Sequence, residues 1–272
     1  MKSYLKLIAI LLLPLAFVIF YAYSPVQIPP PGWKLSKINA PSIPLPPQRR
    51  EEPTQQDSLS CGEGRGKAAP APLEGKDEDV PSLDTMSHRI LFFGDSMVEG
   101  LLRRMNCYAF ANGHKMTNVV WYSSTTELWA QTDTLRYFIN KVEPTFVMIS
   151  LGTNEQFIKD PAGRETYIRK ILQELGDTPF VWIGVPSWKE DTGINELTQR
   201  IVGKNRYFDS RGLTLQRGRD RMHPTFNAAS RWMDTVAVWM SSPETAHPIR
   251  MDKPTDGRKH TYKTYALQPL SN

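Results

Sequence analysis

The stretch ILFFGDSMVEG, residues 90–100, decides the fold of this chain. Its apolar run stops at Gly94-Asp95-Ser96, and from Met97 onward apolar residues recur at helical spacing. A short apolar strand that leads directly into a helix is the opening half of a β-α-β unit. Ser96 stands at the turn between the two elements, where it is either a polar helix cap or a nucleophile.

The alternation of strand and helix continues along the chain. Short apolar runs predict strands, and longer segments with apolar residues at 3.6-residue spacing predict helices. Predicted strands cover residues 89–93, 119–122, 145–151, 180–185 and 206–209, and predicted helices cover residues 97–111, 126–141, 164–175, 194–202 and 224–240. Helical crossovers require parallel strand pairing. We therefore expect a three-layer α/β/α domain over residues 88–241, with a parallel five-stranded sheet.

The N-terminus has a membrane-targeting pattern. Lys2 and Lys6 flank an apolar run from residue 7 to 23, so residues 1–23 are predicted to be an uncleaved membrane anchor or a signal peptide. Positive charge on the N-terminal side places the rest of the chain outside the cytoplasm. We expect the domain in the periplasm or at the cell surface if the segment is retained, and secreted if it is cleaved.

Two further segments flank the predicted domain. More than half of the 22 prolines lie in residues 24–87, a composition that predicts an extended, disordered spacer. The tail, residues 242–272, shows no helical or strand period, and we assign it no function. The two cysteines have no metal-site spacing, and a Cys61–Cys107 bridge is left open by the sequence.

The net charge of +5 does not indicate a nucleic-acid partner. Basic residues are scattered rather than gathered in a stripe, and the export signal also argues against nucleic acid. The charge supports at most a mild preference for anionic glycans or an anionic surface.

Small and polar residues follow each of the first four predicted strands. Carboxyl ends of parallel strands share one edge of a sheet, and ligands bind at that edge in open α/β folds. We therefore expect one site built from residues 94–96, 123–125, 152–154 and 186–188.

A serine nucleophile needs a histidine base, and the base needs an orienting acid. His223 follows the fifth strand with Asp220 three residues before it, so a tight loop can pair the two side chains. His88 and His114 fall at the amino edge, and His260 lies in the tail. His247, with Glu244 three residues before it, is the reserve candidate.

The reaction also needs donors for a developing oxyanion. Asn154 offers a side-chain amide, and Gly152 lets the backbone turn sharply to present it. The backbone N–H groups of Ser96 and Ser124 are further candidate donors.

Gly94-Asp95-Ser96, Gly152-Thr153-Asn154 and the run DRMHPT from Asp220 resemble blocks I, III and V of the SGNH hydrolase superfamily, the GDSL esterases and lipases. The resemblance implies a flavodoxin-like fold, Ser96 as nucleophile, His223 as base and Asp220 as its acid. It further implies an oxyanion hole from Ser96, the block II position and Asn154, supported by Asp95 and Gly152, without a metal or other cofactor.

Two positions depart from the family pattern. Met97 stands where leucine is usual, and Ser124 stands in the block II place of a glycine. This block II form, with the anchor and spacer, is similar to envelope SGNH proteins that act on polysaccharide O-acetyl groups. We expect an esterase or O-acyltransferase acting on an acylated glycan, alone or with a membrane-embedded acyltransferase. The alternative is a catalytically weak glycan-binding or scaffold protein.

For each of three side chains near the predicted site, the sequence allows two interpretations. Trp188 either packs in the core or lines a sugar site. Glu127 and Arg221 either orient substrate or are solvated surface charges.

Overall fold

The computed structural model describes residues 81–269, and the stretch at residues 90–100 forms the predicted strand and helix. Strand β1 spans Arg89–Gly94 and helix α2 spans Met97–Ala111. Gly94 permits a close approach of two strands, because a Cβ there would lie 1.7 Å from the carbonyl oxygen of Ser150. A larger residue at this position would separate the strands where the site begins.

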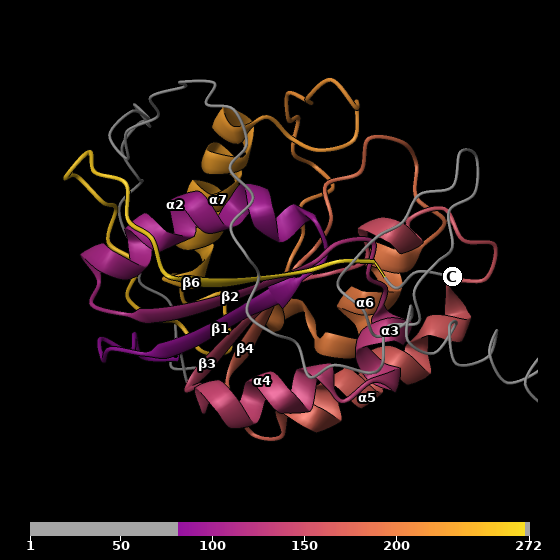
Figure 1. Ribbon diagram of the computed structural model, residues 1–272, viewed down its shortest axis with the longest axis horizontal. Coiled ribbons are helices and arrows are strands. Elements are labelled where there is room, and N and C mark those ends of the chain that lie inside the picture. The colour runs from indigo at the N-terminus through magenta and orange to yellow at the C-terminus, as the bar shows by residue number, and fades with distance from the viewer. Residues whose placement is uncertain (1–80, 270–272) are drawn as a thin grey trace, which may run out of the picture. The chain divides into compact units, whose positions relative to one another are not determined.

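Six parallel strands form one sheet in the order β5-β4-β3-β1-β2-β6 (Figure 1). Those after β1 are Lys115–Trp121 (β2), Phe146–Ser150 (β3), Phe180–Ile183 (β4), Tyr207–Phe208 (β5) and Lys263–Leu267 (β6). The order of β1 to β5 is that of flavodoxin-like doubly wound sheets. The expected α/β class with three layers is confirmed, whereas the expected count of five strands is wrong because β6 adds a sixth.

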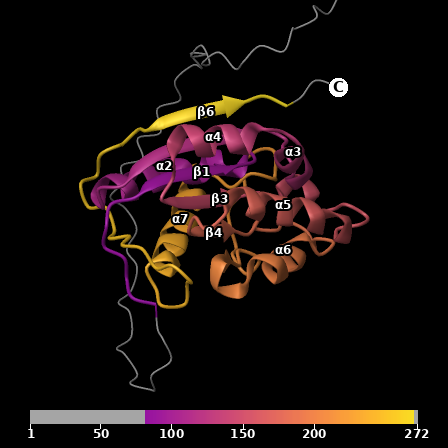
Figure 2. The ribbon, with the colours of Figure 1, turned by 90° about the horizontal axis from the view of Figure 1, so that it is seen from below.

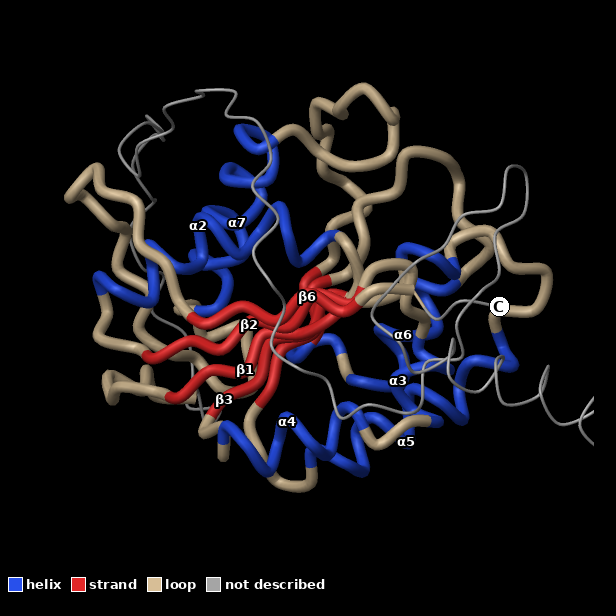
Figure 3. The backbone as a smooth tube through the Cα atoms, in the orientation of Figure 1, coloured by secondary structure: helices blue, strands red, loops and turns tan. Residues whose placement is uncertain are grey.

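Helices cover both faces of the sheet (Figures 1 and 3). Side chains of α2 and of α7 (Phe226–Met240) pack on one face, and the opposite face is covered by α3 (Thr126–Gln131), α4 (Thr134–Val142), α5 (Glu165–Leu175) and α6 (Ile194–Val202). In β1, Ile90 and Phe92 join the first core, whereas Leu91 and Phe93 join the second. Because side chains alternate along a strand, a strand covered on both faces must be continuously apolar.

Two predicted elements have different limits in the structure. The helix predicted over residues 126–141 is two helices, because the backbone is extended at Thr132, whose hydroxyl donates to the Leu128 carbonyl at 3.0 Å. The second strand begins at Lys115 rather than at residue 119. The first half of this strand contains polar residues, including the buried Asn118, and the sequence of that half therefore has no apolar run that would indicate a strand.

The tail contributes both a strand and part of the core, although the sequence of residues 242–272 shows no helical or strand period. Strand β6 pairs with β2 at the outer edge of the sheet (Figure 2). Ile249 and Met251 are buried beside α2 and α7, and Ile249 also forms a parallel bridge with Asp84. The described fold therefore extends beyond residues 88–241 on both sides. An edge strand stays partly exposed, which explains why β6 has no apolar run.

The predictions for residues 1–23, for residues 24–80 of the spacer and for Cys61 lie outside the described residues. Of the two cysteines in the possible Cys61–Cys107 bridge, only Cys107 is described, and it is 3% exposed on α2. Within residues 81–269, no helix has both the length and the apolar character needed to cross a membrane.

Candidate active site

The predicted site residues gather where the strand order of the sheet reverses. Ser96 follows β1, and residues 152–154 follow β3, which is the neighbour of β1 on the side away from β2. In open α/β sheets, connections on the two sides of such a reversal diverge and leave a crevice at the carboxyl edge. The third part of the site is the loop that precedes α7, which carries Asp220 and His223.

The Ser96 side chain does not cap α2, although Ser96 occupies the cap position. Asp95 provides the cap instead, since its Oδ1 accepts the Met97 N–H at 3.0 Å, and its Oδ2 accepts those of Gly152 and Thr153 at 3.2 and 2.9 Å. Burial raises the pKa of the Asp95 carboxyl, and the N–H donors oppose that rise. Asp95 therefore joins the loops after β1 and β3 and leaves the Ser96 hydroxyl to another partner.

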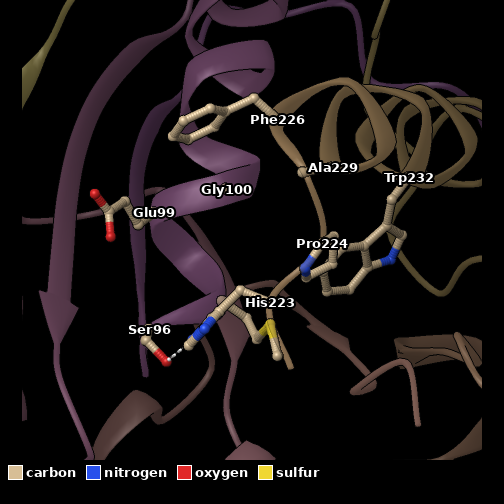
Figure 4. Close-up of a pocket in the computed structure, with 9 residues that line it drawn as sticks. Ser96, Glu99, Gly100, His223, Pro224, Phe226, Ala229 and Trp232 are labelled. Atoms are coloured by element: carbon tan, nitrogen blue, oxygen red, sulfur yellow. Dashed lines mark hydrogen bonds between the residues drawn. The ribbon is translucent and has the colours of Figure 1, made fainter. Parts of the chain in front are cut away.

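That partner is His223. Its Nε2 lies 2.8 Å from the Ser96 Oγ (Figure 4), and its Nδ1 lies 2.6 Å from Asp220 Oδ2. Hydrogen bonds from the His223 ring and from the backbone N–H groups of Met222 and His223 lower the pKa of Asp220 to about 2. A carboxylate at Nδ1 places the ring proton there, which leaves the Nε2 lone pair facing the serine hydroxyl.

Arg217 holds the loop that carries Asp220 and His223. Its guanidinium donates to the carbonyl of Met222 at 2.7 Å and to that of Pro186 at 2.9 Å. No local sequence pattern distinguishes Arg217 from the other arginines of this loop, since its acceptors are backbone carbonyls from two separate segments. The loop also holds Arg221 at a φ of 59°, a conformation that costs a residue other than glycine about 1 kcal/mol.

Asn154 and Ser124 are brought together. Asn154 Nδ2 donates to the Ser124 carbonyl at 2.8 Å, and because an amide NH2 carries two hydrogens, one is left for a substrate oxygen. Within the described residues the Ser96 N–H has no acceptor, as an oxyanion donor requires. The Ser124 N–H, in contrast, donates to the Trp121 carbonyl at 3.1 Å. The oxyanion role of Ser124 therefore remains a prediction, and its N–H is already engaged.

The serine that stands in the block II place is turned into the protein. Ser124 is fully buried, and its Oγ accepts the Trp129 Nε1–H at 2.9 Å. The preceding residue, Ser123, has a φ of 58°, a positive value that types II and I′, but not the common type I, place at the third residue of a turn such as the one closed by the Trp121–Ser124 hydrogen bond. The Ser124 side chain thus contacts α3 rather than the crevice.

Two hydrogen bonds join the tail to the turn that contains Ser124. The backbone N–H of Tyr122 donates to the Leu267 carbonyl at 3.0 Å, and Trp121 Nε1 donates to the Gln268 carbonyl at 3.0 Å. Strand β6 therefore contributes to the position of the turn although it carries no predicted site residue.

A small pocket opens beside Ser96 between α2 and α7 (Figure 4). Its volume is 120 Å³, whereas a cavity of about 150 Å³ holds benzene, so it has room for a few heavy atoms. Glu99, whose carboxylate accepts the Tyr122 hydroxyl at 3.1 Å, is the charged acid in the lining. The rest of the lining is Ser96, Met97, Gly100, His223, Pro224, Phe226, Ala229 and Trp232.

Glu155, which the sequence pattern did not indicate, links the 3-10 helix η1 (Thr153–Glu155) to α3. Its carboxylate accepts the Thr126 N–H at 2.8 Å and hydroxyl at 2.7 Å, and it lies 3.2 Å from Arg164 Nε. Burial raises the pKa of Glu155 against these donors.

Glu127 pairs with the same Arg164 at 2.5 Å, so its contacts are with a neighbouring helix. Arg221 is exposed.

The remaining histidines have other partners. Glu244 and His247 form no ion pair in the described part of the chain, and His260 pairs with Asp256 at 2.5 Å. His88 and His114 lie at the amino edge, as expected. Among residues 81–269, His223 is thus the histidine whose ring contacts a serine hydroxyl.

The candidate site thus consists of the contacts that join Asp220, His223 and Ser96, and of the Asn154 amide that donates to the Ser124 carbonyl. Comparison of the whole chain with known proteins finds no matching family model and no matching curated protein.

Proposed function

We propose that the protein is a serine esterase of the SGNH type that hydrolyses or transfers a small acyl group, acetyl foremost, on a glycan hydroxyl. The observation that carries the proposal is the continuous chain of contacts from Asp220 through His223 to Ser96, at 2.6 and 2.8 Å. These are the three side chains that the resemblance to SGNH hydrolases implies. Their position at the reversal of strand order, where open sheets bind ligands, supports the same function.

In the first half of the proposed reaction, Ser96 Oγ attacks the ester carbonyl carbon and its proton passes to His223 Nε2. The carbonyl π electrons move to the oxygen, and the second hydrogen of Asn154 Nδ2 and the Ser96 N–H stabilise the resulting negative charge. When this intermediate collapses, the bond to the glycan oxygen breaks and that oxygen takes the proton from His223. The acyl group is left on Ser96.

In the second half, water or a sugar hydroxyl loses a proton to His223 Nε2 as its oxygen attacks the acyl carbon. Collapse of the second intermediate returns the proton from His223 to Ser96 Oγ and releases the acid or the new ester. Asp220, whose pKa of about 2 keeps it ionised, stabilises the imidazolium in both halves.

The size and lining of the pocket support a short acyl chain. A volume of 120 Å³ bounded by Pro224, Ala229 and Trp232 suits an acetyl or similar group rather than a long fatty chain. The carboxylate of Glu99 disfavours an anionic acyl group in the same space. The glycan part of the proposal is supported by the predicted export of the domain and by the similarity of block II to envelope SGNH proteins.

A second candidate is a catalytically weak protein that binds glycan within an assembly for polysaccharide modification. The observation that favours it is the Ser124 N–H, which donates to Trp121 at 3.1 Å and is therefore a poorer oxyanion donor than an unengaged N–H.

Covalent labelling by a fluorophosphonate and turnover of p-nitrophenyl acetate test the esterase. We expect the full-length protein to label and to turn over, and Ser96→Ala to lose both, with a fall in kcat of at least about 10³-fold. Ser87→Ala, at an exposed serine of the amino edge, is the matched control and keeps both activities. An unreactive wild-type protein contradicts the proposal and, if it binds glycan, favours the second candidate. Product analysis with a glycan acceptor then separates transfer from hydrolysis.

A further inference from the structure

An aromatic pair that the proposed reaction does not use lies at the same edge of the sheet. Phe157 follows η1 and Trp188 follows β4, and their ring centroids are 5.4 Å apart with the rings at 82°. Phe157 is 44% exposed, whereas Trp188 is half-buried and packs on the core below. We use the name aromatic platform for these two rings together with the neighbouring side chains of Lys189 and Arg217.

The platform is held rigid by hydrogen bonds between its two loops. The N–H and the hydroxyl of Thr192 donate to the Gln156 carbonyl at 2.8 and 3.2 Å. Gln156 is itself fully buried, and its Nε2 lies 3.5 Å from Ser187 Oγ. A ligand that binds to a preformed surface of this kind loses little affinity to ordering of the protein.

Each ring of the platform has a cation beside it. Lys189 Nζ lies 5.8 Å from the Phe157 ring centroid, and the Arg217 guanidinium carbon lies 5.7 Å from that of Trp188. The neighbouring acids have partners of their own, since Asp191 accepts from Asn195 Nδ2 at 2.7 Å and Asp220 pairs with His223. Further exposed basic side chains in the same loops are Lys159, Arg219 and Arg221, and the further exposed acids are Asp160, whose Oδ1 accepts the Gly163 N–H at 3.3 Å, and Glu190.

The platform also adjoins the candidate active site. Phe157 is three residues beyond Asn154, which limits the distance between their Cα atoms to about 11 Å. On the other side, Arg217 donates to the carbonyl of Met222, the residue before His223. A chain molecule lying on the platform can therefore extend to Ser96.

We infer that the aromatic platform binds a glycan whose sugar units carry carboxylates, and so selects an acidic polysaccharide as the substrate. The apolar C–H face of a pyranose packs on the Phe157 and Trp188 rings, and its carboxylate lies near the Lys189 ammonium and the Arg217 guanidinium. A neutral glycan would use the rings but would offer no anion to the Lys189 ammonium or to the Arg217 guanidinium, whose present acceptors are neutral backbone carbonyls. This inference rests on the proposed function, because it names the substrate class of the same site.

Binding is measured by calorimetry on full-length protein carrying Ser96→Ala, so that ester cleavage cannot consume the ligand. The probes are an α-1,4-linked hexamer of galacturonic acid and its carboxyl-reduced, neutral counterpart. We expect the acidic hexamer to bind at least tenfold more tightly, and Phe157→Ala to weaken its binding at least fivefold. Lys189→Gln is expected to reduce the preference for the acidic hexamer, and added salt is expected to do the same.

Matched controls come from a second aromatic and lysine pair on α4. Tyr137 is 40% exposed with Lys141 Nζ 4.8 Å from its ring, near the amino edge. Tyr137→Ala and Lys141→Gln should leave hexamer binding unchanged. The inference is overturned if neither hexamer binds at millimolar concentration, if both bind equally, or if the control variants lose as much as the platform variants. The esterase proposal fails separately, by absence of p-nitrophenyl acetate turnover in the protein with Ser96 intact.

Discussion

Two histidines lie at opposite edges of the sheet in different surroundings. At the carboxyl edge, the His223 side chain is 39% exposed and lies between the Asp220 carboxylate and the Ser96 hydroxyl. At the amino edge, His114 is 2% exposed, its Nδ1 accepts the His88 N–H at 3.1 Å, and its Nε2 lies 2.9 Å from the Arg250 carbonyl. Both side chains therefore use both ring nitrogens, with different kinds of partner.

The difference shows that the partners of an imidazole, rather than its burial, decide what it can do. The His114 ring joins two backbone groups, so a gain or loss of a proton breaks one of its hydrogen bonds. Burial also lowers the pKa of His114, which keeps the ring neutral. The His223 ring has an ionised acid on one nitrogen and an exchangeable hydroxyl proton on the other. That ring can accept a proton without losing either partner.

The strongest test of this comparison replaces each histidine by glutamine. His223→Gln removes the proposed base and is expected to lower kcat/KM for p-nitrophenyl acetate by about 10³- to 10⁴-fold, with unchanged thermal unfolding. His114→Gln is expected to keep kcat/KM within about threefold at 25 °C, because His114 lies at the other edge of the sheet. Equal losses of activity in the two variants would show that His223 acts only through the fold.

A smaller effect is expected from Asp220→Asn. The amide keeps the shape of Asp220 but loses the charge that fixes the ring proton on Nδ1. Because the Asp220 side chain is 51% exposed and solvent screens its charge, kcat should fall by about 10²-fold, less than the roughly 10⁴-fold loss for a buried triad acid. In the wild type, a pKa of about 2 means that Asp220 is ionised well below its ordinary value of 3.8, and it loses its charge only as the pH falls through about 2. A plot of kcat/KM against pH should therefore show no carboxylate step between pH 3 and 5, and a step there would contradict this assignment.

The tail links the two edges, and shortening it separates their contributions. Tyr262 donates to the His114 carbonyl at 3.0 Å, whereas Leu267 and Gln268 hold the turn that contains Ser124. A chain that ends at Tyr262 keeps the contact with His114 and loses those beside the site. We expect kcat to fall about tenfold, since small displacements of reacting groups are costly. Unchanged kcat in a folded, truncated protein would remove β6 from the support of the site.

The smallest expected effect is a pH dependence of stability caused by His114. Its pKa is lower in the folded protein than the ordinary value of 6.5, so the unfolded chain takes up the proton first as the pH falls. The contribution of His114 to stability is therefore complete above pH 6.5 and declines below it, by at most about 1.4 kcal/mol per pH unit.

Urea unfolding of the wild type and of His114→Gln at pH 7.5 and 5.5 measures this contribution. The variant should lose less stability than the wild type between the two pH values. The same slope in the wild type and in His114→Gln would mean that the pKa of His114 does not differ between the folded and unfolded states.

The sequence by itself determined the α/β class, the strand-to-helix turn at Ser96 and the short spacing that pairs Asp220 with His223. These features depend on local periodicity and on residues a few positions apart, which a linear reading detects. The three-dimensional structure was needed to show that Asp95 caps α2 in place of Ser96, that Arg217 holds the loop that carries Asp220 and His223, and that the Ser124 N–H is engaged. It also supplied β6, since an exposed edge strand is defined by its pairing with β2 rather than by an apolar run. Hydrogen-bond partners distant in the chain leave no periodic signal, and these partners decide what each polar residue of the site can do.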